Sequence, residues 1–292
     1  MSATDDPRPS LTDRLQTALF VALMRVVQCL PYERRVPLAG RLTARAAALT
    51  GFDRRIRHNL ALACPELPAE EVARLTRAVP DNIGRALAEI YSGPEFLARV
   101  RDLPLTGPGA ARLAELKSAG KPAILAASHF GNYDAWRGAL AAQGYPIGAL
   151  YRPMNNRAFN TQYVSAISGI ARPLFARDKR GMAQMLRFLR EGGFLALGMD
   201  QYFHAGAELT FFGKLARTPL SAAEIALKYN VPLIPIFAVR QPDGLSFRIE
   251  VEAEIAPGPP EAMTQAFNDV LEAKVRAHMD QWFWIHRRWK YL

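Results

Sequence analysis

The sequence is poor in cysteine and has no long hydrophobic run. Its 292 residues contain two cysteines, Cys29 and Cys64, and no Cys-x-x-Cys pair. This usage excludes a disulfide scaffold and a cysteine-based zinc site, and it fits a reducing compartment. The most apolar stretch near the N-terminus, Leu15 to Met24, is too short to span a bilayer, which takes about 20 apolar residues. A conventional membrane-spanning helix is therefore not expected.

The signature motifs of several enzyme classes are also missing. No Gly-x-Gly-x-x-Gly follows a strand pattern, and neither a Gly-Lys-Ser/Thr phosphate loop nor a His-Glu-x-x-His helix occurs. The absence of a Gly-x-Ser-x-Gly turn argues against a serine nucleophile. We therefore expect no metal, no organic cofactor and no covalent acyl-enzyme.

Acidic residues are outnumbered by basic ones. Lys and Arg total 37 against 27 Asp and Glu, which gives a formal net charge of +10. Such a surplus attracts anionic partners at long range without choosing between nucleic acid, anionic lipid and an acidic protein. Because no nucleic-acid recognition motif accompanies the charge, we expect no nucleic-acid partner.

Residues 1–31 are expected to form a polar leader followed by an apolar, membrane-interacting helix. Wound as a helix, the segment gathers its apolar residues on one broad surface. The polar residues form a narrow stripe: Arg14, Thr17, Arg25 and Gln28. Seven arginines and two acidic residues follow between Glu33 and His58, and such basic clusters favour an anionic, cytoplasmic membrane surface. The alternative is an amphipathic helix packed on the domain, followed by a solvated helical face.

The rest of the chain, residues 32–292, is expected to form a single α/β domain that begins with a helical region. From residue 121 onward, short apolar runs alternate with helical patterns. The predicted strands are Ala123–Ala127, Ile147–Tyr151, Phe194–Met199 and Val231–Val239, and the predicted helices are Asp134–Gln143, Arg157–Ser168, Lys179–Arg190 and Pro219–Tyr229. This alternation predicts a mixed, largely parallel central sheet flanked by helices.

The C-terminal part departs from this alternation. Ser246 to Ile255 alternates apolar and polar residues, which is typical of a strand with one exposed face, antiparallel and at or near a sheet edge. A final helix is expected from about Glu261. Three tryptophans then follow among basic residues, which favours their assignment to a lipid interface, with a cap on the core as the alternative: Trp282, Trp284 and Trp289.

The most informative residues follow the predicted strand that ends at Ala127. His129 lies at the carboxyl end of this strand, Gly131 and Asn132 supply a turn, and Asp134 starts the next helix. Across such a corner the Asp134 carboxylate can fold back to one imidazole nitrogen of His129 and leave the other free to accept a proton. The pattern predicts a His129–Asp134 general-base dyad at the carboxyl end of a strand, where open α/β sheets bind ligands.

Further polar residues follow two other predicted strands. Arg152 precedes a proline that keeps the chain extended, and we predict that it stabilises an oxyanion or binds an acceptor phosphate. Asp200 and Gln201, together with Asn132, are expected to bind or orient substrate. His129, Asp134 and Asp200 lack the spacing typical of a metal site, so no metal is assigned to them.

The corner motif resembles that of the lysophospholipid acyltransferase superfamily. It is most similar to the bacterial lipid A late acyltransferases, which share Ser-His-x-Gly-Asn-x-(Asp/Glu). Three later segments are similar in the same order, Tyr151 to Asn156, Leu189 to Gln201 and Phe211 to Pro219, as is the ending from Trp284 to Lys290. The resemblance covers roughly residues 10–290 and implies a glycerolipid-acyltransferase-like fold.

The resemblance also implies an activity. A fatty acyl chain would pass from a thioester, carried by acyl carrier protein or coenzyme A, to a hydroxyl of a lipid A precursor, an anionic glycolipid. The reaction would take place at the cytoplasmic face of the bacterial inner membrane, to which the N-terminal helix would attach the protein as a peripheral or monotopic enzyme. His129 would be the base and Asp134 its partner.

Two alternatives stay open. Many lipid A enzymes carry Glu where this chain has Asp134, whereas some mannolipid acyltransferases carry Asp. The acceptor could therefore be another glycolipid or a lysophospholipid, for example a mannolipid. The alternative from a different class is a basic membrane-binding protein without catalytic activity.

Overall fold

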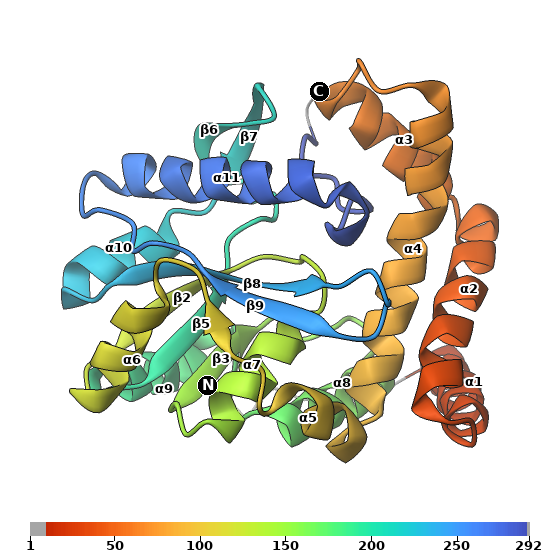
Figure 1. Ribbon diagram of the computed structural model, residues 1–292, viewed down its shortest axis with the longest axis horizontal. Coiled ribbons are helices and arrows are strands. Elements are labelled where there is room, and N and C mark those ends of the chain that lie inside the picture. Colours follow the sequence, from red (N-terminus) through yellow and green to blue (C-terminus); the bar gives the residue numbers. More distant parts are fainter. Residues whose placement is uncertain (1–9, 291–292) are drawn as a thin grey trace.

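The computed structural model describes residues 10–290, and its centre is a seven-stranded sheet (Figure 1). The sheet order is β1-β9-β8-β2-β5-β3-β4, and all neighbouring strands run parallel except β8 and β9. The strands are β1 (Leu105–Thr106), β2 (Ala123–Ala127), β3 (Ile147–Tyr151), β4 (Leu174–Ala176), β5 (Phe194–Gly198), β8 (Leu233–Arg240) and β9 (Phe247–Val251). The predicted mixed, largely parallel sheet is confirmed. The first part of the predicted leader, residues 1–9, lies outside the described residues.

Strands β2 and β5 lie at the centre of the sheet because their residues are apolar on both faces. Along β2, Ile124 and Ala126 belong to one hydrophobic core, whereas Leu125 and Ala127 belong to the other. The continuous apolar runs that predicted these strands are therefore the runs that are covered on both sides. Strand β9 pairs antiparallel with β8 and lies next to the short edge strand β1, in agreement with its alternating pattern.

Helices cover both faces of the sheet. One face packs against α9 (Lys179–Arg190), α10 (Ser221–Tyr229) and α11 (Pro260–Ala277). The other face packs against α5 (Pro94–Val100), α6 (Ala110–Ser118), α7 (Tyr133–Ala142) and α8 (Arg157–Ile170). A separate antiparallel hairpin of β6 (Ala207–Phe211) and β7 (Lys214–Thr218) stands beyond α11 (Figure 1). The sequence did not predict this hairpin, β1 or β4.

The expected helical region is confirmed as α1 (Leu11–Gln28), α2 (Tyr32–Thr50), α3 (Phe52–Ala63) and α4 (Ala69–Tyr91). Helix α4 runs past one end of the sheet, and α2 lies along its outer side (Figure 1). Close approach of these two helices depends on Gly84, because a Cβ there would lie 2.6 Å from the main-chain oxygen of Ala39. The backbone of α2 at Ala39 therefore packs directly against Gly84 of α4.

Helix α1 packs on the protein through Thr17, Met24 and Val27, which are buried, and through Phe20, whereas Arg14, Arg25 and Gln28 of the predicted polar stripe are exposed. The Thr17 hydroxyl donates to Asn156 at 3.4 Å, and the Gln28 amide donates to the Tyr91 carbonyl. The opposite, apolar face points outward, and its large side chains are between 50% and 74% exposed: Leu11, Leu15, Leu19, Leu23 and Val26. Within residues 10–290, no helix combines the length and the apolar character needed to cross a membrane.

The C-terminal tryptophans are buried, so their assignment to a lipid interface is wrong. Trp282, Trp284 and Trp289 are each at most 4% exposed. Their rings pack against one another and against Phe211 and Phe212 of the hairpin region, for example with 5.3 Å between the ring centroids of Trp282 and Phe211. The aromatic side chains close the core beneath the hairpin, which the linear sequence does not show.

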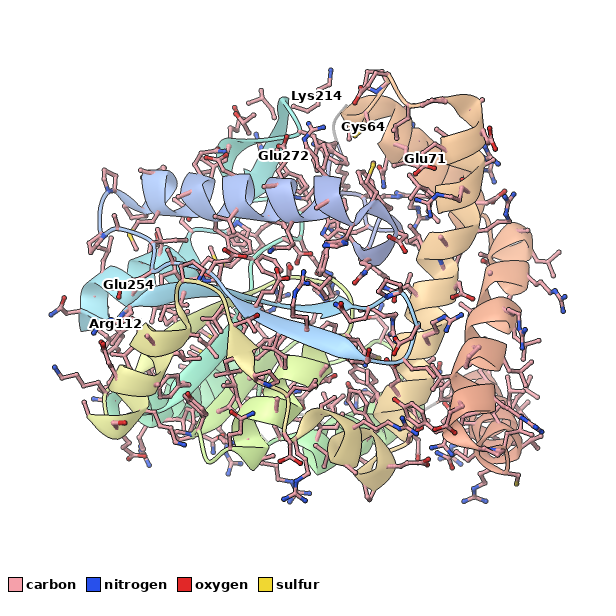
Figure 2. The ribbon with its side chains drawn as sticks, in the orientation of Figure 1. Cys64, Glu71, Arg112, Lys214, Glu254 and Glu272 are labelled. Carbon is pink, nitrogen blue, oxygen red and sulfur yellow. The ribbon has the colours of Figure 1, made fainter. Side chains whose placement is uncertain are left out.

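Polar contacts join the outer elements to this frame (Figure 2). Arg112 on α6 donates to Glu254, which lies after β9, with 2.9 Å between Nε and Oε2. Glu272 on α11 accepts the main-chain N–H of Phe212 at the turn of the hairpin, next to Lys214. The hairpin is therefore held by a polar contact to α11 as well as by aromatic contacts to the C-terminal tryptophans.

The close contact between α2 and α4 predicts that Gly84→Ala destabilises the protein. The new methyl group would overlap the Ala39 carbonyl and the Thr43 hydroxyl, and such overpacking costs roughly 1–3 kcal/mol. Gly169→Ala, in helix α8, is the matched control because nothing lies within 4 Å of its Cβ position; it should leave stability unchanged or raise it by up to about 1 kcal/mol. Urea unfolding of both variants measures the difference, and equal midpoints would contradict the close packing.

Candidate active site

His129 and Asp200 meet at the carboxyl ends of two neighbouring strands. Strands β2 and β5 are parallel, and their register pairs Ala127 with Gly198. Each strand is followed two residues later by a functional side chain, so both side chains arise at the same edge of the sheet. The Nδ1 atom of His129 lies 2.8 Å from Oδ1 of Asp200. The structure therefore contains a His–carboxylate pair, but its acid comes from β5.

The carboxylate of Asp200 is held by two further hydrogen bonds. Its Oδ2 atom accepts the main-chain N–H of His129 at 2.8 Å and the indole N–H of Trp282 at 3.0 Å. Burial raises the pKa of Asp200, but the attraction of His129 and these hydrogen bonds outweigh it and lower the pKa to about 2. Asp200 is therefore an anion throughout the physiological pH range.

Asp134 does not contact His129, so the predicted His129–Asp134 dyad is wrong. Asp134 is fully buried and forms an ion pair with Arg137, which also donates to the Ala171 carbonyl at 3.1 Å. The reason is local geometry. Helix α7 begins at Tyr133, so Asp134 lies in its first turn, where its neighbour is the residue three positions later.

Asn132 stabilises the turn between β2 and α7. Its side-chain oxygen accepts the main-chain N–H of Asp134 at 3.0 Å and caps α7, while its amide donates to Glu89 at 2.8 Å. The side chain is 1% exposed. Its oxygen and its nitrogen both form hydrogen bonds within the protein. Asn132 therefore holds the site in place and does not face the substrate.

A groove of about 1060 Å³ opens beside His129. One wall is apolar and consists of Ala127, Ala149 and Ala196 from the strands and Trp136 and Ile167 from the helices. The imidazole of His129 is 34% exposed and lines this groove. The catalytic candidate is thus accessible from a cavity that has the size and apolar lining typical of a site for a hydrocarbon group.

Two arginines stand side by side at the groove. Arg152 follows β3, is exposed and lines the groove where the sequence placed it. Arg177, which sequence reasoning missed, follows β4, and its main-chain N–H donates to the Tyr151 carbonyl at 2.8 Å. Because Tyr151 pairs with Ala176 in parallel strands, the two arginines leave the sheet at the same edge.

The loop after β5 supplies Gln201 and is fixed by a histidine from the C-terminal segment. Gln201 is exposed, and its Nε2 lies 3.4 Å from Nε2 of His129. The main-chain N–H of Tyr202 donates to Nε2 of His286 at 2.8 Å. Burial lowers the pKa of His286 to about 4, so this ring is neutral and accepts the bond. Only its place in the similar C-terminal segment could have pointed to His286.

The arrangement suits a general base. The bond from Nδ1 to Asp200 leaves Nε2 of His129 to take a proton from a group in the groove. Burial lowers the pKa of His129, but the charge of Asp200 and its hydrogen bond more than offset this and raise it above the ordinary value. Within the described residues, no group of three or more His, Cys, Asp or Glu side chains is arranged to hold a metal ion.

The chain is similar to known acyltransferases. The model of a family described as bacterial lipid A biosynthesis acyltransferase matches residues 5–291. Two proteins of Mycobacterium tuberculosis strains, each named phosphatidylinositol mannoside acyltransferase, are 25% identical over 290 residues, which cover 97% of this chain and 92% of theirs. A protein of Mycolicibacterium smegmatis with the same name is 24% identical over 287 residues, covering 92% of this chain and 90% of its own.

Because Asp200 contacts His129 and Asp134 contacts Arg137, we expect Asp200→Asn to change the His129 pKa and Asp134→Asn to change stability. Asp200→Asn removes the charge that raises the pKa of His129, so burial then lowers this pKa below its ordinary value of about 6.5. Asp134→Asn leaves the His129 pKa close to wild type but isolates the buried Arg137, which costs about 3–5 kcal/mol of stability. Histidine NMR titration and urea unfolding test both variants. A fall in the His129 pKa in Asp134→Asn but not in Asp200→Asn would support the His129–Asp134 dyad and contradict the His129–Asp200 pair.

Proposed function

Because the chain belongs to the family of bacterial lipid A biosynthesis acyltransferases, we propose that it transfers a fatty acyl chain from a thioester to a glycolipid hydroxyl, with His129 as general base. The observation that carries this proposal is the 2.8 Å contact between His129 and Asp200 at the edge of the groove. Membership in a family of acyltransferases removes the alternative of a non-catalytic membrane-binding protein.

The proposed reaction is a direct transfer. Nε2 of His129 takes the proton of the acceptor hydroxyl as its oxygen attacks the thioester carbonyl. The tetrahedral intermediate then collapses, the carbon–sulfur bond breaks, and the leaving thiolate receives the proton from His129. The products are an ester and a free thiol, and Asp200 stabilises the imidazolium that exists between the two proton transfers. No step requires a covalent acyl-enzyme or a cofactor.

Gln201 and the two arginines are proposed to bind the polar parts of the substrates. The Gln201 amide lies 3.4 Å from Nε2 of His129, so it is close enough to orient a hydroxyl that approaches this nitrogen. Arg152 and Arg177 are proposed to stabilise the oxyanion or to bind a phosphate of the acceptor. Their position at the ends of β3 and β4, beside the end of β5, supports either role.

The acyl chain is proposed to lie along the apolar wall of the groove. Ala149 and Ala196 are directly paired in neighbouring strands, and Ala127 lies on the same face of the sheet. Small side chains there leave room between the sheet and the helices α7 and α8, which contribute Trp136 and Ile167. A hydrocarbon chain that fills this room would be removed from water, which favours binding.

For the acceptor we propose a lipid A precursor, and a mannolipid is the second candidate. The family description supports the first acceptor. The relatives at 24–25% identity are named for phosphatidylinositol mannoside, which favours the second. Both are anionic glycolipids, so the positive net charge of +10 suits either. For the donor we propose acyl carrier protein, an acidic partner for a basic chain, with acyl-CoA as the alternative.

The protein is also proposed to attach to the cytoplasmic face of the inner membrane through α1. The outward apolar face of α1 is continuous along the helix, and its other face is engaged by α8 and α2. This arrangement supports a helix that lies in the interface plane. Exposed arginines of α2 and α3, such as Arg41, Arg45 and Arg54, add attraction to anionic lipid.

The proposed chemistry predicts that His129→Ala lowers acyl transfer by about 10²- to 10⁴-fold, because a positioned general base contributes that factor. Purified protein is assayed with acyl carrier protein and acyl-CoA donors against a lipid A precursor, a phosphatidylinositol mannoside and a lysophospholipid. His58→Ala, an exposed histidine on α3, is the matched control and should retain full activity. Full activity of His129→Ala would refute the mechanism, and the preferred acceptor decides between the two glycolipids.

The proposed attachment predicts that Leu19→Glu lowers binding to vesicles that contain phosphatidylglycerol. A charge on the outward face of α1 opposes burial in the lipid interface, and co-sedimentation should fall severalfold. Leu215→Glu is the matched control, because Leu215 is 60% exposed on the separate hairpin. Binding should also weaken with salt, which screens the arginines. Equal binding of both variants would contradict attachment through α1.

A further inference from the structure

The main chain on either side of Trp282 forms hydrogen bonds with the turn that carries His129. The main-chain N–H of Gly131 donates to the Gln281 carbonyl at 2.7 Å, and that of Phe283 donates to the His129 carbonyl at 3.0 Å. Phe130 and Trp282 thereby form an antiparallel bridge. Trp282 is thus held in place next to the strand end that carries His129.

The indole of Trp282 has one polar atom, and it is directed at the catalytic carboxylate. Its Nε1 lies 3.0 Å from Oδ2 of Asp200, and both side chains are at most 2% exposed. A buried indole N–H requires a partner, and a charged acceptor forms a stronger bond than a neutral one. Without Trp282, Oδ2 would keep only the main-chain N–H of His129.

We propose that Trp282 is a positioning residue for the acyl transfer, which holds the plane of the Asp200 carboxylate so that Oδ1 faces Nδ1 of His129. The inference rests on the proposed role of His129 as the base. Trp282 touches no reacting atom; it acts through Asp200. Its ring is wedged against Phe211 and Trp284, with centroid distances of 5.3 and 4.8 Å, so the direction of its N–H is fixed.

The other groups near Asp200 leave this role to Trp282. His286 is neutral and accepts the Tyr202 N–H. Arg288 is buried, but its hydrogen bonds go to the Arg217 carbonyl and the Thr218 hydroxyl. The Tyr133 hydroxyl pairs with Tyr163 at 2.7 Å. Each of these groups has a hydrogen-bond partner other than the carboxylate, whereas Trp282 donates to the carboxylate directly.

Loss of the indole N–H should change the acid–base behaviour of His129 in a defined direction. The main-chain N–H of His129 still binds Oδ2 in such a variant and keeps the carboxylate beside the imidazole. With one hydrogen bond fewer, this carboxylate is a stronger base and attracts the imidazolium proton more strongly. His129 would then lose its proton at a higher pH, by about half a pH unit. A less firmly oriented carboxylate should also lower kcat about tenfold, with little change in the KM of the acyl donor.

Trp284 provides a matched control within the same segment. It is equally buried, and its indole N–H donates to the Met279 main-chain carbonyl at 2.6 Å. Trp282→Phe and Trp284→Phe therefore each remove one aromatic N–H and its hydrogen bond, but only the first bond reaches Asp200. As a further variant, replacing Trp282 by benzothienylalanine exchanges the N–H for sulfur and keeps the shape of the ring.

The test combines a titration with kinetics. The pKa of His129 is measured by NMR of histidine-labelled protein without substrate, assigned with His129→Ala, and the pH profile of kcat/KM is measured with acyl donor and glycolipid. We expect both the pKa and the acidic limb of the profile to move upward in Trp282→Phe and in the benzothienylalanine protein, and to stay in place in Trp284→Phe.

Two results would overturn the proposal. One is an unchanged His129 pKa in the benzothienylalanine protein, and the other is an equal change in Trp282→Phe and Trp284→Phe, which would indicate a merely structural effect. The NMR titration needs no turnover, so failure of this inference is distinguishable from failure of the proposed function, which would appear as an absence of acyl transfer by the wild-type protein.

Discussion

The hydrogen bond between His129 and Asp200 is the contact on which the proposed chemistry depends, and the central sheet brings these two residues together. The two residues follow strands that are far apart in the chain but adjacent in the sheet. The pairing of Ala127 with Gly198 places both residues at the same edge of the sheet. A slip of one residue in this register would turn the side chains to opposite faces. Burial of both strands in two hydrophobic cores protects against such a slip.

The corner that carries His129 is stiffened by buried polar contacts. Asp134 pairs with Arg137 on one side, and Asn132 binds Glu89, which in turn forms a buried ion pair with Arg240. The turn itself requires Gly131, because a Cβ at this position would lie 2.1 Å from a main-chain oxygen of β8, and its φ is +56°. Residues that look catalytic in the motif therefore serve to hold the base in place.

The N-terminal helix and the groove lie on connected parts of the structure. Phe20 of α1 packs against Phe159 of α8 with 5.0 Å between ring centroids, and Phe159 stacks on Tyr163, which lines the groove. The outward apolar face of α1 and the groove are thus linked through α8. This link suits the proposed attachment through α1 and the proposed lipid acceptor.

Local sequence was sufficient for most of the central strands and for the candidate base His129, but not for the carboxylate that pairs with it. Continuous apolar runs predicted β2 and β3 with their observed bounds, and the residues after these strands pointed to His129 and Arg152. Proximity in sequence suggested Asp134, whereas the acid is Asp200, because hydrogen bonding across a parallel sheet joins residues that no local pattern connects. The burial of Trp282 and the outward direction of the leucines of α1 were likewise decided by packing. Helix α1 has apolar side chains on more than one side, and its sequence does not say which of them meet the protein.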